Sequence, residues 1–266
     1  MVPPDEYGDQ RVVGHSTDVL GAQGDCALNW ERDTFGNRVA RVRAQSVPLA
    51  IEFTVDYTVE RLAGSNSKPL PKTADLGAYL SPTALTAPND RLRNAAEELS
   101  AQADVAGVVE PAAREHALAK GASAWAARAI AYQLGVTGVQ TPAAMALHLG
   151  RGVCQDYAHI AIALLRILGV PARYVSGHLL GEGAPHAWLE ALLPDLERPG
   201  HRSAVPYDPT HSGRVGLNYI TVAVGRDYAD VAPTSGTFTG PSPGVFSTRK
   251  EASVVALDLG DGVASS

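Results

Sequence analysis

The sequence contains little cysteine. Only Cys26 and Cys154 occur among 266 residues. A chain of this length with two cysteines is not a disulfide-held scaffold, and it lacks the four clustered ligands of a cysteine-rich zinc module. We therefore expect no structural metal and no cofactor, and each cysteine has to be judged from its own surroundings.

Lysine is also scarce. The chain has four lysines and 18 arginines, which are scattered, and 28 acidic residues leave a net charge of −6. A nucleic-acid-binding protein needs a clustered basic surface, so this balance argues against one.

Long apolar runs are absent too. No stretch of 18 apolar residues occurs, so the sequence predicts no membrane-spanning helix. The first ten residues, MVPPDEYGDQ, are acidic and proline-containing, and they lack the basic start and apolar centre of a secretory signal. On this basis we expect a cytoplasmic protein without a membrane partner.

Composition divides the chain into four parts. Residues 1–66 alternate between apolar and polar side chains and predict a β-domain, and residues 67–90 are rich in Gly, Ser and Pro, as linkers are. Residues 91–232 begin with sequence patterns typical of helices and continue with strand candidates, which predicts a second domain of the α+β class. Residues 233–266 are expected to form a C-terminal extension with a returning strand at 253–257 and a disordered end, GDGVASS.

The second domain contains one especially well-defined helix, over residues 154–168. Its apolar residues recur at helical spacing, and glycine and proline follow it directly. The alanine-rich sequence at 112–133 also predicts a helix, and we expect Gly121 to interrupt this helix. Strand candidates follow the helices at 172–180, 186–193, 204–208 and 219–224.

Cys154 begins the well-defined helix, directly after a glycine-rich turn. A thiol at this position experiences the positive end of the helix dipole and unpaired backbone N–H groups, which favour the thiolate. Gly152 is expected to let the chain approach closely and to leave room for an acyl group. The alternative is that Cys154 is a small buried apolar residue.

Two downstream residues favour a catalytic role for this cysteine. His186 begins one strand candidate and Asp208 ends the next one. A thiol acyl-transferase needs these three groups, because the cysteine attacks, the histidine exchanges the proton and the carboxylate orients the histidine. Trp188 falls on the same strand face as His186, where it would either shield the pair from water or serve as a core aromatic.

Several blocks of the chain resemble the bacterial transglutaminase-like family. Their order and spacing make a chance match improbable. They are GVCQDYAH at 152–159, LGVPARYVSG at 168–177, HAW at 186–188, YDPT at 207–210, VGRDYADV at 224–231 and DTFGN at 33–37.

The resemblance implies a papain-like core, in which a helix carrying the cysteine packs on an antiparallel sheet carrying the histidine and the aspartate. It identifies Cys154 as the nucleophile, His186 as the general base and Asp208 as the orienting carboxylate. It also implies a preceding small β-sandwich, which is truncated or reduced because no counterpart of the family's first strand precedes Val12.

The remaining site candidates surround these three residues. The backbone N–H of Cys154 is the natural oxyanion donor, and further candidates for the oxyanion hole or the cleft are Gly152, Val153, Gln155 and Trp188. His178 and His211 lie close to the triad in sequence, and a metal site made of these two and His186 stays open, although their spacing is not that of tight ligands. Cys26 has no helix behind it and is expected to be inert.

The sequence thus predicts a thiol enzyme that acts on peptide or protein amide bonds through a Cys154 thioester. Water would complete a hydrolysis and an amine acceptor would complete a transamidation, and we favour hydrolysis. One alternative is a non-catalytic module that binds peptides or proteins in the papain-like cleft. Another is a metal hydrolase with a cysteine ligand. The separation of the Cys154 sulfur from the His186 ring distinguishes the enzyme from the binding module.

Overall fold

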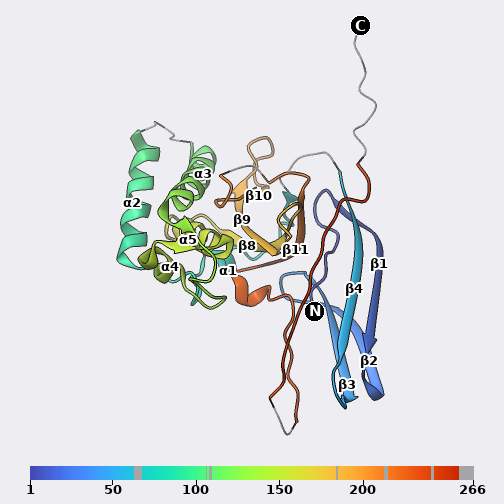
Figure 1. Cartoon of the computed structure of the whole chain (residues 1–266). Coiled ribbons are helices and arrows are strands. Elements are labelled where there is room, and N and C mark those ends of the chain that lie inside the picture. Colours follow the sequence, from blue (N-terminus) through green and yellow to red (C-terminus); the bar gives the residue numbers. More distant parts are fainter. Residues whose placement is uncertain are drawn as a thin grey trace.

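The computed structural model of the chain describes residues 1–62, 68–105, 107, 110–183, 185–212, 215–240 and 243–257. Helices pack on one side of a central sheet, and four long strands lie on its other side (Figure 1). None of the helices in these ranges combines the length and the apolarity that crossing a membrane requires.

The central sheet has five strands in the order β11-β8-β9-β10-β5, and all neighbours are antiparallel. This sheet and the helices beside it confirm the predicted α+β class. The four strand candidates of the second domain correspond to four strands of the sheet. The strands are β5 (Lys68–Pro69), β8 (Ala172–Leu179), β9 (Pro185–Pro194), β10 (Arg202–Tyr207) and β11 (Tyr219–Gly225).

Helix α5 (Cys154–Ile167) lies between the sheet and the other helices. It contacts β8 and β9 on one side, and on the other it contacts α2 (Asp90–Val105), α3 (Pro111–Ala129) and α4 (Ala143–Leu149). Every residue of α5 from Gln155 to Arg166 is buried. Because α5 is covered on all sides, it has little freedom to shift, and the residue at its N-terminus is held in place.

Gly121 does not interrupt the helix, contrary to our expectation, because α3 runs without a break from Pro111 to Ala129. A Cβ atom at position 121 would lie 3.2 Å from the Leu99 side chain of α2. The glycine therefore permits a close contact between two helices and does not mark a helix end.

The expected linker at 67–90 is part of the packed structure. Its residues Lys68–Pro69 form the edge strand β5, which pairs with β10. Residues Leu76–Leu80 form the short helix α1, whose Tyr79 is buried against Leu192. A strand of two residues is too short to be recognised in a proline-rich sequence, so the composition of this segment indicated a linker. The division of the chain into domains stays a prediction.

The N-terminal region consists of two antiparallel two-stranded sheets that face each other. The rings of His15, Trp30 and Tyr57 connect them, since the His15 ring lies 6.5 Å from Trp30 and 5.7 Å from Tyr57. Strand β1 (Gln10–Leu20) pairs with β4 (Glu52–Arg61), and β2 (Gln23–Arg32) pairs with β3 (Arg38–Ser46).

The prediction of a strand at 253–257 is wrong. In the described part of the C-terminal extension, residues 233–240 and 243–257, the backbone forms no strand. Val254, Val255 and Leu257 are exposed, and an apolar run forms a strand only where a neighbouring edge pairs with it. The end that was expected to be disordered, GDGVASS, lies outside the described residues.

Two amide side chains of the N-terminal region hold the outer edge of the central sheet. Gln10 donates to the carbonyl of Thr221 and accepts from its N–H, both at 2.8 Å. Asn37 makes the same pair of bonds with Val224, also at 2.8 Å. Because β11 is an edge strand, these bonds satisfy backbone groups that have no neighbouring strand.

A buried carboxylate joins the N-terminal segment to strands β5, β8 and β9 of the central sheet. Glu190 on β9 is fully buried and lies 2.8 Å from the Lys68 ammonium and 2.9 Å from Nε of Arg173. Tyr7 donates a further hydrogen bond to it. Burial alone would raise the pKa of Glu190, but the charges of Lys68 and Arg173 lower it to about 2. Three segments of the chain thus depend on one negative charge.

We predict that Glu190→Gln lowers the free energy of unfolding by about 3–5 kcal/mol, because two buried cations lose their counter-charge. The pKa of the folded state lies below the ordinary value of 4.5, so this stabilisation is complete above about pH 4.5 and is lost as the pH falls towards 2. Urea unfolding of both proteins between these pH values and neutral pH measures the difference. The exposed Glu97→Gln is the matched control, and equal stability of Glu190→Gln and wild type at neutral pH would contradict the prediction.

Candidate active site

Cys154 is the first residue of α5, and a short parallel strand pair positions it. Strand β6 (Ala131–Tyr132) pairs with β7 (Arg151–Gly152), and the Gln133 N–H donates to the Gly152 carbonyl at 2.8 Å. The thiol is partly exposed at the positive end of a buried helix, where a negative charge is favoured. Its own N–H is one of the first-turn donors that the helix does not use.

Asp156 closes the first turn of α5. Its Oδ2 accepts hydrogen bonds from the Val153 N–H at 2.8 Å and from the Thr137 hydroxyl at 2.6 Å. A Cβ atom at position 152 would lie 2.5 Å from the same oxygen. Gly152 therefore makes room for Asp156, a role that we did not expect from the sequence. The Val153 N–H is engaged in this cap, so it is not an oxyanion donor either.

Gln155 is also occupied by a structural role. Its side-chain amide donates to the carbonyls of Gly138 and Val139, both at 3.3 Å, and only 7% of the residue is exposed. The side chain holds the loop that precedes α4 and does not supply an oxyanion donor. Of the predicted donors, the Cys154 N–H is the one whose position remains suitable.

The sheet brings His186 and Asp208 together. His186 lies near the start of β9, Asp208 directly follows β10, and the two strands pair. Nε2 of His186 lies 2.8 Å from Oδ2 of Asp208, and Cys154 also interacts with the same ring and raises its pKa. The three residues selected from the sequence thus lie together, with the histidine hydrogen-bonded to the aspartate and influenced by the cysteine.

The charges of His186 and Asp208 stabilise each other. Burial alone would lower the pKa of His186, but the hydrogen bonds with Asp208 and Cys154 raise it to about 10. Burial alone would raise the pKa of Asp208, but bonds with His186, His211 and Tyr219 lower it to about 2. These two shifts favour an aspartate beside an imidazolium at neutral pH.

Residues 103–201 match the family model of the transglutaminase-like superfamily. This part of the chain is similar to that superfamily. The match contains Cys154 and His186 and ends before Asp208, the hydrogen-bond partner of His186.

Relatives of known sequence are longer than this chain. The uncharacterized protein ML0607 of Mycobacterium leprae is 34% identical over 197 residues, which cover 70% of this chain and 64% of that protein. The uncharacterized protein Mb2599c of Mycobacterium bovis is 39% identical over 119 residues, which cover 41% of this chain and 35% of that protein. The chain therefore spans less than two thirds of the length of these relatives.

One solved structure shares the fold over most of the chain. It is described as a proposed cysteine protease from Cytophaga hutchinsonii, with a TM-score of 0.61 and 23% sequence identity. The likeness covers 87% of this chain and 76% of that one. It shows that the shared fold extends well beyond residues 103–201.

Aromatic rings cover the buried side of the histidine–aspartate pair. Trp188 is fully buried, and its ring stacks beside His186 with centroids 6.1 Å apart. Tyr219 on β11 packs edge-on against Trp188 and donates a hydrogen bond to Asp208 at 2.8 Å. A Cβ atom at Gly177 would lie 2.5 Å from the Trp188 ring, so this glycine gives the ring its space. Trp188 therefore lies behind the histidine and does not line an open cleft.

Two further residues extend the candidate site on its solvent side. His211 places Nδ1 2.8 Å from Oδ2 of Asp208 and Nε2 2.7 Å from the Glu182 carboxylate. The other Glu182 oxygen lies 3.3 Å from Nδ1 of His186. Sequence reasoning considered His211 but missed Glu182, although its place in the short turn between the strands of His178 and His186 was a usable signal.

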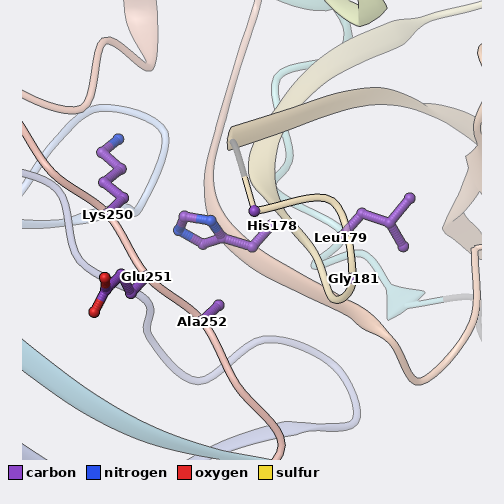
Figure 2. Close-up of a pocket in the computed structure, with 7 residues that line it drawn as sticks. His178, Leu179, Gly181, Lys250, Glu251 and Ala252 are labelled. Atoms are coloured by element: carbon purple, nitrogen blue, oxygen red, sulfur yellow. The ribbon is translucent and has the colours of Figure 1, made fainter.

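Two other candidates lie outside this site. His178 on β8 faces the C-terminal extension at Lys250 and Glu251 (Figure 2). Burial and the Lys250 charge lower the pKa of His178. It therefore does not join His186 and His211 as the third ligand of the metal site that the sequence left open. Cys26 is exposed on β2.

We predict that Gly152→Ala displaces the Asp156 side chain and lowers the free energy of unfolding by about 1–3 kcal/mol. Because Asp156 caps the turn that carries Cys154, the variant should also react more slowly with iodoacetamide at that thiol. Mass spectrometry of the alkylated peptides and urea unfolding measure the two effects. Gly138→Ala is the matched control, since a Cβ atom there would meet nothing within 4 Å. Identical behaviour of the two variants would refute the assignment of Gly152.

Proposed function

We propose that this chain is a thiol-dependent acyl-transfer enzyme that acts on amide bonds of peptides or proteins. The observation that carries the proposal is the position of Cys154 at a helix N-terminus, where a negative charge is favoured, together with its interaction with the His186 ring that is hydrogen-bonded to Asp208. A module that only binds peptides has no need of this arrangement, and the contact of the thiol with the imidazole argues for the enzyme.

The geometry assigns a role to each group. The Cys154 thiolate attacks the carbonyl carbon of the amide, and the Cys154 N–H stabilises the oxyanion that forms. The His186 imidazolium gives its proton to the leaving amine, which departs as the thioester forms. Water or an amine then attacks the thioester and loses a proton to His186, and the thiolate is released. Asp208 orients the ring and stabilises its positive charge.

Hydrolysis is the outcome that we propose for the second step. Next to His186, the side chains of Glu182 and His211 are 38% and 40% exposed, so water reaches the place where the thioester would form. The proposed protease function of the Cytophaga hutchinsonii structure supports the same outcome. A reducing compartment such as the cytoplasm would keep the single thiol usable.

We predict that Cys154→Ala abolishes turnover and that Asp208→Asn lowers kcat by about 10³–10⁴-fold, because the histidine loses its orientation and its counter-charge. The assay is release of peptides from a protein substrate, followed by mass spectrometry, with circular dichroism to confirm that each variant folds. The control is Cys26→Ser, which should keep wild-type activity because Cys26 is exposed on β2, away from the site. Full activity of Cys154→Ala would refute the proposed nucleophile.

We predict that hydrolysis products exceed amine adducts when the protein is incubated with a peptide library and a primary amine. Mass spectrometry separates cleavage, deamidation and amine incorporation, and the Cys154→Ala variant gives the background. Predominant amine incorporation would contradict hydrolysis and support transamidation. Peptide binding without any product would support the binding module.

A further inference from the structure

We propose that Glu182, His186 and His211 form a binding site for a divalent transition-metal ion, of which Zn²⁺ fits best. The occupied site would be unable to catalyse acyl transfer. This inhibition rests on the proposed function, whereas the binding of the ion does not.

The spacing of the three side chains suits such an ion. Their nearest ligand atoms all lie within 4.8 Å of one another in the described part of the chain. The Glu182 oxygens already reach both rings, at 2.7 Å from His211 and 3.3 Å from His186. Ligand atoms of a tetrahedral Zn²⁺ with bonds of about 2.0–2.1 Å lie about 3.3 Å apart, so an ion fits among them with small side-chain movements.

Asp208 already holds both rings as a metal site requires. Its Oδ2 lies 2.8 Å from Nε2 of His186 and 2.8 Å from Nδ1 of His211. Metal-binding histidines commonly have their second ring nitrogen fixed by a carboxylate in this way. The nitrogens that remain, Nδ1 of His186 and Nε2 of His211, are the two that face Glu182.

The site is also accessible and has a place for a fourth ligand. The His186 side chain is 1% exposed, whereas those of Glu182 and His211 are 38% and 40% exposed, so an ion enters from solvent without opening the sheet. The Cys154 thiol interacts with the His186 ring, which makes it the candidate for the fourth ligand. Two histidines and a glutamate with one further position form a known zinc ligand set.

An ion at this site would remove the proton carrier of the proposed reaction. His186 holds Asp208 through Nε2, which leaves Nδ1 to exchange the proton with Cys154. Zn²⁺ displaces the proton from Nδ1 to solvent and binds the lone pair that this proton occupied, and a Zn²⁺–thiolate bond would withdraw the nucleophile as well. Removal of the ion with a chelator would restore both groups.

The test is a calorimetric titration of the full, chelator-treated chain with Zn²⁺. We expect one ion per chain, and an affinity that His211→Ala and Glu182→Gln each weaken by about tenfold or more. His178→Gln is the matched control, because this histidine lies on the neighbouring strand outside the cluster, and it should bind Zn²⁺ like the wild type. Since Glu182 lies on an exposed turn, its variant tests the site even where a His211 variant folds poorly.

A Cys154 variant distinguishes the proposed three-ligand site from a site formed by Cys154 and His186 alone. We expect Cys154→Ala to keep measurable Zn²⁺ binding through the three proposed ligands. If Cys154→Ala loses the ion while His211→Ala and Glu182→Gln bind as the wild type does, the ion is held by Cys154 and His186 alone and the proposal is overturned. Absence of Zn²⁺ binding to the wild type overturns it too.

Activity measurements keep the two proposals apart. In an active protein, Zn²⁺ should inhibit peptide release, and His211→Ala should need about tenfold more Zn²⁺ for the same fractional inhibition. Zn²⁺ binding without inhibition would refute the inhibitory role. Zn²⁺ binding to a protein that has no acyl-transfer activity would refute the proposed function and support the metal site.

Discussion

A single oxygen atom, Oδ2 of Asp208, accepts hydrogen bonds from His186, His211 and Tyr219. A buried carboxylate is stable only with such partners, because burial without them costs several kcal/mol. The partners come from β9, from the loop after β10 and from β11, so the strand order of the sheet has to be in place before this oxygen is satisfied. The orientation of the imidazole, and with it the whole site, depends on this one atom.

The second half of the site comes from the helical layer. Cys154 reaches the imidazole because α5 is packed between the sheet and three helices and is closed at its first turn by Asp156. Helix and sheet are close-packed, which fixes the contact between the thiol and the ring more firmly than a loop would. The carboxylate of Asp208 orients both His186 and His211. The proposed base and the proposed metal ligand therefore depend on the same hydrogen-bond acceptor.

The sequence was informative where the pattern is local. The helix that Cys154 begins and the strands that carry His186 and Asp208 follow from periodicity and from glycine and proline signals. Glu182 and Tyr219 were missed because their roles depend on a turn geometry and on a strand order that no local pattern contains. For Gly152, the need for space was recognised correctly but the occupant was not, since the sequence does not reveal that Asp156 folds back onto the residues before it.

The hydrogen bonds from the side-chain amides of Gln10 and Asn37 to the outer strand of the sheet have a consequence for peptide recognition. An extended peptide is often recognised by adding itself as a new strand to an exposed sheet edge. Here the backbone groups of Thr221 and Val224 on β11 are already occupied by those side chains. A peptide therefore finds these two positions of the β11 edge already taken, and if the proposed enzyme binds an extended peptide, it does not do so by adding a strand there.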